Sequence, residues 1–572
     1  MLFIIAVVSR KETVKTGAEK GYNSILTEAL RSQLQNSGSE SVHQVCLVFK
    51  CLSSEEVEAE VFQRTGINRS LLSETGREYS AEEINTYIIT ERQVYAELQM
   101  KRHCEFLNAF PDIRDLIQNS NSEENYYCSK LAPFIYVALT ETQIVSLLEY
   151  ENLVLIDVVP DAEPVSPLNS CIETVRADYV RDSLYYKGGG IKIGMTMFNG
   201  YPSSVDGLFN ESYFYRDPNG AASATDAHGT LTAYPIVGQA VISGGIAYEG
   251  IVPNASMHTS TVSTIANWVD RMEWLLLERQ VNVINLSMGW LTGCYYSSID
   301  GWIEHIGINH SVHIIVSAGN SNGAISPAFA YNVITVGAVR ETSSDGTLAG
   351  YHSWFSQYWA DGIYNTTVFS KPDICAPGED IYIPTIGSVS GTSLSAPIVA
   401  AIVAEACQAN SGLLEKQATM KAILAASIHH PLALQDSDNE FQMMGAGMVD
   451  AYASFYTASN GNWISGNFPA GTAQGSTATY SFSVSSTDLP VRVALSWLKN
   501  TNIQSGGGWT NPTVSGLKLT VLDPNGVEIR SSTKMNLSVI SFLPTITGNY
   551  TIKITFLAGD TSQTTYYGAA WW

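Results

Sequence analysis

The chain has 572 residues, which is enough for about two to four domains. Hydrophobic residues make up 45% of it and charged residues 15%, with 45 Gly, and this composition excludes a disordered chain and is typical of an ordered globular one. The formal net charge is -23, so we expect no nucleic-acid partner, because such a partner needs a basic surface.

The first eight residues, MLFIIAVV, are apolar and precede Ser9, Arg10 and Lys11. A secretory signal carries its basic residues first, so this order favours a buried first strand over an incomplete export signal. Elsewhere no stretch holds about 20 consecutive apolar residues, which is the length that crosses a bilayer. We therefore expect no membrane span.

Residues up to about 165 carry charged helical patterns and indicate an α+β domain. Ser80 and Glu83 form a capping-box pattern, which predicts a helix that runs to about Leu107. Three further elements are predicted downstream: a strand over 134–139, a short helix that Thr140 and Gln143 cap, and a strand over 153–159. The segment Asp161–Pro167 is rich in Pro, Ser and acidic residues and indicates a domain boundary.

From about Ser170 to Ser454, short apolar strands alternate with helical stretches, which predicts a parallel sheet covered by helices. The predicted strands read IKIGM, VNVINLSM, HIIVSAG and NVITVGAV. After about Ser459 the helical signals end, and the chain reads as a small β-sandwich. Its predicted strands are Thr477–Val484, Val491–Trp497, Leu517–Val521 and Tyr550–Phe556.

The eight cysteines show no CxxC pairs and no His partners at zinc spacing, so we expect no structural zinc. Several fit the pattern of small buried hydrophobic residues, and a disulfide within the stretch from Cys46 to Cys128 stays open. The set is Cys46, Cys51, Cys104, Cys128, Cys171, Cys294, Cys375 and Cys407.

The strongest local motif is GTSLSAP at 391–397, which precedes the apolar helix IVAAIVAEAC. A helix N-terminus offers unpaired N–H groups and the positive end of the dipole, which suit both a nucleophile at Ser393 and the oxyanion that its attack forms. The alternative is that Ser393 is an ordinary N-cap.

Two more motifs complete the candidate site. His228 begins the motif HGT, and a neutral imidazole is the natural base for a serine hydroxyl, although a lone His is more often structural. Asn320 ends SAGN directly after the strand HIIV, where its amide can donate to an oxyanion, although a turn Asn at a strand end is common.

Because HGT, SAGN and GTSLSAP occur in this order, the stretch from about Val180 to Ser454 resembles the subtilisin-like serine peptidase family. The resemblance implies an endopeptidase acting on polypeptides without a required cofactor, while structural calcium and any metal ligands stay open. It also implies that Ser287, Met288 and Gly289 pair with the extended substrate backbone. The resemblance is also the basis on which we expect a secreted or cell-surface location.

The fold expected from the resemblance is α/β, with a subtilisin-like parallel sheet covered by helices at 169–456. An α+β propeptide-like domain with extra helices precedes it at 1–168, and a β-sandwich follows at 457–572. In the family, the propeptide acts on its own catalytic domain as a folding aid and inhibitor. The N-terminal region is therefore an expected intramolecular partner.

One family feature is missing. The first core strand of the family ends in Asp-Ser/Thr-Gly, whose carboxylate orients the base, yet the strand at 191–200 places Met197 or Phe198 there. Asn199 can accept a hydrogen bond but carries no charge, and its amide can also stabilise the wrong tautomer. Three nearby carboxylates stay open as substitutes: Asp206, Asp217 and Asp226.

These residues favour a serine endopeptidase in which Ser393 forms an acyl-enzyme, His228 is the general base and Asn320 lies in the oxyanion hole. Its activity is expected to be weak without the carboxylate. The rival hypothesis is a pseudopeptidase that binds peptides or proteins without turnover. A third hypothesis is an adhesion protein in which the β-sandwich makes the contacts.

Overall fold

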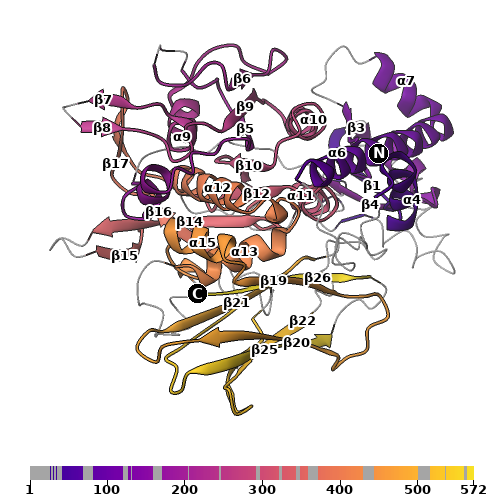
Figure 1. Cartoon of the computed structure of the whole chain (residues 1–572). Coiled ribbons are helices and arrows are strands. Elements are labelled where there is room, and N and C mark those ends of the chain that lie inside the picture. Colours follow the sequence, from indigo (N-terminus) through magenta and orange to yellow (C-terminus); the bar gives the residue numbers. More distant parts are fainter. Residues whose placement is uncertain are drawn as a thin grey trace.

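The structure is a computed structural model that describes residues 26, 27, 30, 34, 41–67, 81–119, 126–158 and 171–572, apart from short gaps. The gaps are 131, 204, 206, 244–245, 292–296, 321–324, 343–347, 359–370, 429–442, 500–515, 535 and 559–562. We call 26–158 the N-terminal region, 171–459 the central region and 463–572 the C-terminal region. In Figure 1 the indigo N-terminal region lies beside the central region, and the yellow C-terminal region lies beneath it.

The N-terminal region is a four-stranded antiparallel sheet with the order β2-β3-β1-β4 and helices packed against it. The strands are β1 (Val42–Phe49), β2 (Tyr126–Cys128), β3 (Phe134–Thr140) and β4 (Leu153–Val158). The helices are α4 (Ser54–Thr65), α6 (Ala81–Ala109), α7 (Pro111–Asn119), α8 (Glu141–Ser146) and η2 (Leu147–Glu149). The predicted strand-helix-strand unit is confirmed, with the Thr140–Gln143 capping box in place. The long predicted helix is α6, and Ser80 lies outside the described residues.

The central region contains a sheet of seven parallel strands, with one antiparallel strand, β15, at its edge. Neighbouring strands run β15-β14-β12-β10-β5-β9-β6, and β16 also pairs with β14. The strands are β5 (Lys192–Met197), β6 (Phe214–Arg216), β9 (Ser256–Thr261), β10 (Val283–Leu286), β12 (His313–Ser317), β14 (Ile334–Thr342), β15 (Leu348–His352) and β16 (Ile374–Pro377). The four strands predicted from the sequence are β5, β10, β12 and β14.

Helices cover both faces of this sheet because its strands are apolar on both sides. Val283 and Ile315 pack into a core with α9 (Ala227–Val237), α12 (Thr392–Ala409) and α13 (Gln417–Ala426). Their neighbours Ile284 and Ile314 face the other way, toward α10 (Ile265–Leu277) and α11 (Ser298–Asn309). The N-terminal sheet packs against the helices on this second face. Remaining short elements are η3 (Tyr179–Ser183), β7 (Val241–Ser243), β8 (Ile246–Tyr248), β11 (Trp290–Leu291), β13 (Ile325–Ser326), β17 (Ile381–Ile383), β18 (Gly387–Val389), η4 (Ser411–Leu413) and α15 (Ala451–Ser459).

The C-terminal region consists of two four-stranded antiparallel sheets that pack face to face. One contains β19 (Trp463–Phe468), β26 (Thr565–Trp571), β21 (Val491–Trp497) and β24 (Leu537–Phe542); the other contains β20 (Thr477–Val484), β25 (Gly548–Ala558), β22 (Gly516–Leu522) and β23 (Glu528–Ser532). Aromatic rings join them, as in the pair Phe482–Trp571, whose centroids are 5.5 Å apart. The predicted fold class is thus confirmed, and these two sheets contain the four strands predicted for this region, whereas the exact domain limits stay a prediction.

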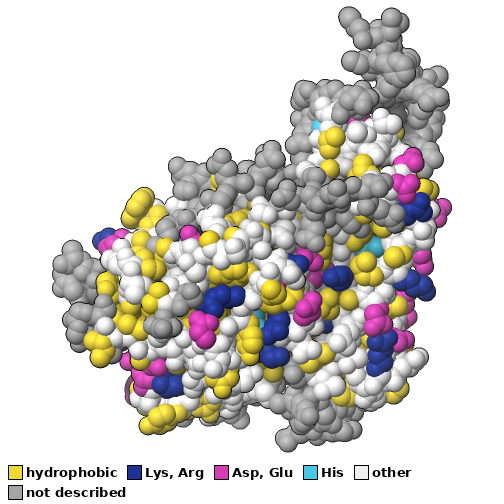
Figure 2. Space-filling view, turned by 90° about the horizontal axis from the view of Figure 1, so that it is seen from above, with side chains coloured by type: hydrophobic (Ala, Val, Ile, Leu, Met, Phe, Trp, Pro, Cys, Tyr) yellow, Lys and Arg dark blue, Asp and Glu magenta, His cyan; other side chains and the backbone are white. Residues whose placement is uncertain are grey.

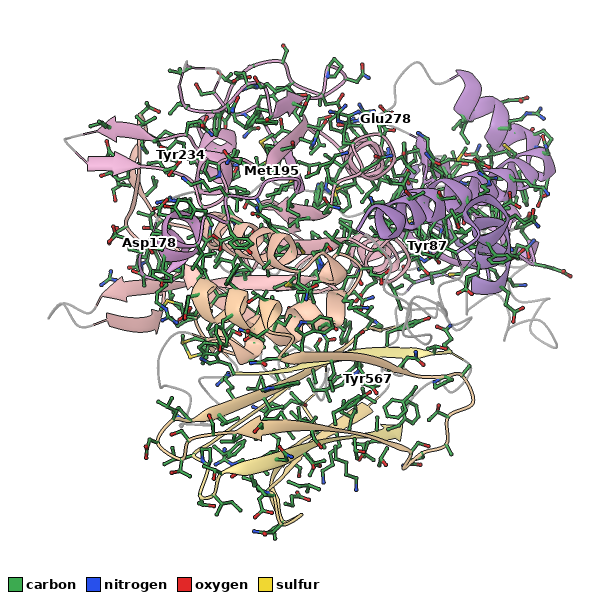
Figure 3. All side chains as sticks on the ribbon, viewed as in Figure 1. Tyr87, Asp178, Met195, Tyr234, Glu278 and Tyr567 are labelled. Carbon is green, nitrogen blue, oxygen red and sulfur yellow. The ribbon has the colours of Figure 1, made fainter. Side chains whose placement is uncertain are left out.

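Side chains fill all three regions in Figure 3, which labels Tyr87 on α6, Met195 on β5 and Tyr567 on β26. Among the described helices, α12 is long and apolar enough to cross a membrane, but 89% of its apolar window is buried within the fold. It is the central helix of the core. On the face shown in Figure 2, acidic and basic side chains are interspersed.

The cysteines behave as small core residues. Seven of the eight are described and no disulfide joins any two of these seven, so the disulfide that the sequence left open within the stretch from Cys46 to Cys128 is absent from the described residues. Four of them are buried, namely Cys46, Cys128, Cys375 and Cys407. Cys294 lies outside the described residues.

Candidate active site

Ser393 is the second residue of α12 and is 3% exposed. Its hydroxyl Oγ donates to the carbonyl oxygen of Ser287 at 3.3 Å, and its own carbonyl accepts from Ser287 Oγ at 2.7 Å. Ser287 directly follows β10, so these two bonds fix the start of α12 at the carboxyl end of that strand. The N-cap is Gly391, with no side-chain cap bond, so the interpretation of Ser393 as an ordinary N-cap is wrong.

Asn320 follows β12, the strand next to β10, and its amide orientation is fixed by α12. Its Oδ1 accepts from the Thr392 backbone N–H at 2.7 Å and from Thr392 Oγ1 at 2.8 Å. A backbone N–H can only donate, so the oxygen must face Thr392 and the Nδ2 amide must face the opposite way. Gly319 before it adopts φ +104, which an L side chain rarely does, and its N–H donates to Thr392 Oγ1 at 3.0 Å.

His228 lies in the first turn of α9, where Asp226 is the N-cap and accepts from the His228 backbone N–H at 2.7 Å. The residue is partly exposed, but its ring nitrogen Nε2 is buried and has no hydrogen-bond partner among the described residues. Burial lowers the pKa of His228 to about 4, against a smaller opposing effect of Asp226. The imidazole is therefore neutral at pH 7 and can accept a proton.

The start of α9 lies against the carboxyl end of β5, the strand on the other side of β10. A Cβ placed on Gly229 would lie 3.0 Å from Met197 Sδ and 2.9 Å from the Gly200 carbonyl oxygen, so only Gly fits after His228. Helices α9 and α12 also pack against each other. His228, Ser393 and Asn320 thus gather over the carboxyl edge of three adjacent strands, although no hydrogen bond joins His228 to Ser393.

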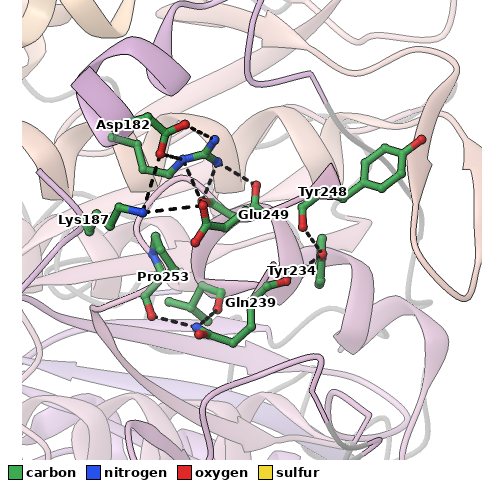
Figure 4. Close-up of polar contacts among 10 residues, drawn as sticks. Asp182, Lys187, Tyr234, Gln239, Tyr248, Glu249 and Pro253 are labelled. Atoms are coloured by element: carbon green, nitrogen blue, oxygen red, sulfur yellow. Dashed lines mark hydrogen bonds and ion pairs between the residues drawn. The ribbon is translucent and has the colours of Figure 1, made fainter. Parts of the chain in front are cut away.

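The far end of α9 is held by hydroxyl and amide contacts that Figure 4 draws. Tyr234 Oη donates to the carbonyl oxygens of Gln239 and Tyr248, both at 3.0 Å, and Gln239 Nε2 donates to the Pro253 carbonyl at 2.9 Å. These bonds connect α9 to the segment that leads into β9. They fix the direction in which the first turn of α9 presents His228.

The segment Ser287–Gly289 turns its side chains inward. Ser287 and Met288 are 3% and 2% exposed, and Met288 Sδ accepts from Thr196 Oγ1 at 3.4 Å. A Cβ on Gly289 would lie 2.8 Å from the Ser326 carbonyl oxygen. Only the backbone of this segment remains to face a ligand.

The position of the missing carboxylate is occupied by a core residue. Met197 is 1% exposed, Phe198 packs edge-on against Trp290 at 5.4 Å between ring centroids, and Asn199 is exposed at φ +67. None of these three, and no carboxylate among the described residues, hydrogen-bonds the His228 ring.

Two of the three carboxylates left open by the sequence are described, and neither of these two hydrogen-bonds the His228 ring. Asp217 is buried, pairs with Arg271 at 2.9 Å and accepts from Ser260 Oγ at 2.8 Å. Asp226 caps α9, and Asp206 lies outside the described residues. Likewise, the described residues contain no group of three or more His, Cys, Asp or Glu side chains that could hold a metal ion, and calcium stays a prediction.

Sequence reasoning missed the supporting residues of this site. Thr392 orients Asn320 through both its N–H and its hydroxyl, and Asn285 Nδ2 donates to Ser287 Oγ at 3.0 Å, behind Ser393. Thr392 stands inside the GTS motif, so its place before Ser393 was the available signal.

A model of the subtilase family matches residues 135–447, more than half of the chain. The chain belongs to the subtilase family. This subtilase is 26% identical over 325 residues to serine protease AprX of Bacillus subtilis (strain 168), an alignment that covers 48% of the chain and 68% of AprX. It is 26% identical over 212 residues to thermophilic serine proteinase of Bacillus sp. (strain AK1), an alignment that covers 35% of this chain and 47% of that protein. It is 32% identical over 132 residues to subtilisin-like protease 2 of Pseudogymnoascus destructans, an alignment that covers 22% of this chain and 28% of that protein.

The chain thus spans less than half the length of the last two of these relatives. Among solved structures, it is similar to the crystal structure of MycP1 with the N-terminal propeptide removed, with a TM-score of 0.37 and 21% identity over 50% of this chain and 95% of that one. It is also similar to the structure of the prenylagaramide maturation protease PagA, with a TM-score of 0.37 and 22% identity over 48% of this chain and 98% of that one.

Proposed function

We propose that this subtilase is a serine endopeptidase that hydrolyses peptide bonds of proteins through an acyl-enzyme on Ser393. The observation that carries the proposal is the gathering of Ser393, Asn320 and a neutral His228 over one edge of the sheet. Subtilases related to this chain are named as serine proteases, which supports a polypeptide substrate.

In the proposed reaction, His228 Nε2 takes the hydroxyl proton as Ser393 Oγ attacks the substrate carbonyl carbon. The oxyanion accepts from Asn320 Nδ2 and from the Ser393 N–H, both pre-positioned by α12. His228 then gives the proton to the amine as the C–N bond breaks, and water removes the acyl group by the same steps in reverse. The backbone of Ser287, Met288 and Gly289 pairs with the extended substrate.

The second candidate function is a pseudopeptidase that binds peptides or proteins. The observation that favours it is Met197, because its thioether stands where a carboxylate is expected and cannot stabilise an imidazolium. Loss of this carboxylate costs about 10⁴ in rate while the oxyanion donors keep some catalysis over water. The first candidate therefore predicts slow turnover and the second predicts none.

Labelling with a fluorophosphonate probe, which reacts only with an activated serine, separates the two. We expect the wild type to be labelled slowly, Ser393→Ala not at all, and the control Ser395→Ala as fast as the wild type. Ser395 lies on the same helix, is buried and donates to the Pro377 carbonyl at 3.1 Å. Equal labelling of wild type and Ser393→Ala would show that no serine peptidase is present.

Four further expectations accompany this proposal. The N-terminal region acts on its own chain as folding aid or inhibitor, and the domains run over 1–168, 169–456 and 457–572. The chemistry requires no cofactor, and the protein is secreted or at the cell surface. The location rests on the resemblance to the family, and the first eight residues lie outside the described residues.

A further inference from the structure

Two glycines flank the candidate active site, one on each of two backbone segments. Gly289 ends the segment that is proposed to pair with the substrate, and Gly319 precedes the oxyanion donor Asn320. A Cβ placed on Gly289 would lie 3.1 Å from Ile325 Cδ1, and a Cβ placed on Gly319 would lie 3.3 Å from the same atom. The end of one side chain, that of Ile325, therefore lies against both segments.

These distances mean that Ile325 fills the space between the two segments. Carbon atoms in favourable contact lie about 3.5–4.0 Å apart, so a methyl group added to either glycine would already be too close to the Ile325 side chain. Ile325 is 3% exposed and belongs to the same core cluster as Trp290 and Phe329. The space beside the oxyanion donor is thus closed from below by an aliphatic side chain.

Ile325 and the segments around it are held in place by hydrogen bonds. Strand β13, which contains Ile325, pairs with β11 in an antiparallel ladder. Ser326, the other residue of β13, donates through its Oγ to the fully buried carboxylate of Asp300. On the opposite side, the Gly319 carbonyl accepts from the Gln357 backbone N–H at 3.0 Å. A substrate side chain that needs this space must therefore break fixed contacts to obtain it.

The substrate residue that this space would receive follows from the proposed reaction. The carbonyl oxygen under attack must reach Asn320 Nδ2 while its carbon reaches Ser393 Oγ, and the backbone before it lies along Ser287–Gly289. The residue that carries this carbonyl, which we call the acyl residue, therefore lies between the two glycine segments. Side chains of an extended strand point alternately to its two faces, so an acyl side chain that turns toward the protein meets Ile325.

We infer that Ile325 restricts the acyl residue to glycine or alanine, so that the substrates are polypeptides cut after a small residue. This inference rests on the proposed function, because only a peptidase forms an acyl-enzyme. Glycine places no atom against Ile325, and alanine places one methyl group there. A leucine or phenylalanine side chain would have to displace a buried side chain from a packed core, which is unfavourable in the same way as overpacking.

The test measures how fast Ser393 is labelled by peptide phosphonate probes that differ only in the residue attached to phosphorus. That residue takes the place of the acyl residue, and the series is Gly, Ala, Leu and Phe. Each molecule needs to react only once, so the assay does not depend on fast turnover, and mass spectrometry identifies Ser393 as the labelled residue. We expect the Gly and Ala probes to react at least about 100-fold faster than the Leu and Phe probes.

Two substitutions at Ile325 should change this order of rates. Ile325→Ala should raise the rate of the Leu and Phe probes at least about 10-fold and change the rate of the Gly probe less than about threefold. Should Ile325→Ala fail to fold, as circular dichroism would show, Ile325→Val decides. It removes Cδ1 alone, and the rate of the Leu probe relative to the Gly probe should rise about fivefold.

The matched control is Ile303→Val, which deletes the same atom from a fully buried isoleucine of the same core cluster, on α11. It should leave the order of rates unchanged. A fluorophosphonate with a short alkyl chain and no peptide separates two kinds of failure. If that probe leaves Ser393 unlabelled, the proposed function is wrong and this inference with it.

The inference alone is overturned if the alkyl probe labels Ser393 while the Leu and Phe probes react as fast as the Gly probe. Folded Ile325 variants that keep the wild-type order of rates would overturn it too. An equal change of rates in Ile303→Val and the Ile325 variants would have the same meaning, because the effect would then come from a loosened core.

Discussion

The substitution Met197→Asp restores a carboxylate to the end of β5. The Asp Oδ atoms and Met Sδ are both three bonds from Cα, so an aspartate oxygen can take the place of the thioether. That thioether lies 3.0 Å from a Cβ placed on Gly229, the residue after His228. Met197 is 1% exposed, so the new carboxylate would be buried and would need a charged partner, which an imidazolium provides.

The size of the effect follows from the role of that carboxylate. A triad without its Asp loses about 10⁴ in rate, which sets the upper limit of the gain, and we expect at least about 100-fold in kcat/KM. The carboxylate should also raise the pKa of His228 from about 4 toward or above its ordinary value. The base must be neutral to act, so activity rises with pH through this pKa. The acid limb of the rate profile should therefore lie near pH 4 in the wild type and at least about two units higher in the variant.

The assay is kcat/KM on an unstructured protein substrate between pH 3 and 10, with Met197→Asn as the control of equal shape and no charge. Met197→Asn should show neither the gain nor the shift. If Met197→Asp behaves like Met197→Asn while both unfold at similar temperatures, the missing carboxylate does not limit this site.

Three other outcomes are expected. Asn320→Ala should lower kcat about 100- to 1,000-fold with little change in KM, and steady-state kinetics with an unchanged kcat would contradict its role as oxyanion donor. Glu405 is fully buried, neither of its oxygens has a partner among the described residues, and burial raises its pKa well above the ordinary value. The native state then keeps a proton that the unfolded chain loses, so stability falls as pH rises from about 4.5 toward the raised pKa of the native state. Within that range, urea titrations should show Glu405→Gln gaining about 1.4 kcal/mol per pH unit over the wild type. Gly289→Ala, whose Cβ would lie 2.8 Å from a carbonyl oxygen, should lose about 1–3 kcal/mol of stability in thermal unfolding, whereas Gly189→Ala, with 3.7 Å to its nearest neighbour, should not.

The sequence was sufficient to place the candidate site because its motifs stand at strand and helix ends. Ser393 begins an apolar helix and Asn320 ends an apolar strand, and in a parallel sheet such ends meet at one edge. The orientation of the Asn320 amide was beyond prediction, since it depends on Thr392, which is 72 residues away in the chain. The alternative that Ser393 is the N-cap is wrong for a local reason, because Gly391 already occupies the N-cap position of α12.

The contact of Arg92, a buried residue of α6, with backbone carbonyl groups of the central region could not be predicted either. Arg92 stands in the stretch TERQVY, whose charged residues are typical of a helix in water. Its burial depends on two helix ends that lie 184 to 219 residues further along the chain. The pattern of one helix contains no information about the carbonyl groups of another region that its side chains contact.

The resting hydrogen bonds of the site favour the peptidase over the binding module. Among the described residues, His228 Nε2 is buried without a hydrogen-bond partner, which costs about 1–3 kcal/mol, and a module that only binds has no use for that cost. The one hydrogen bond of Ser393 Oγ to a described residue is the long bond to the Ser287 carbonyl, 3.3 Å against about 2.7–2.8 Å for an ordinary O–H···O bond, so rotation of the hydroxyl away from it loses little. The proton that the reaction must move and the nitrogen that must receive it therefore belong to two of the least satisfied groups in the site. Binding of an extended substrate on the Ser287–Gly289 backbone would compete for the Ser287 carbonyl and turn the hydroxyl toward His228.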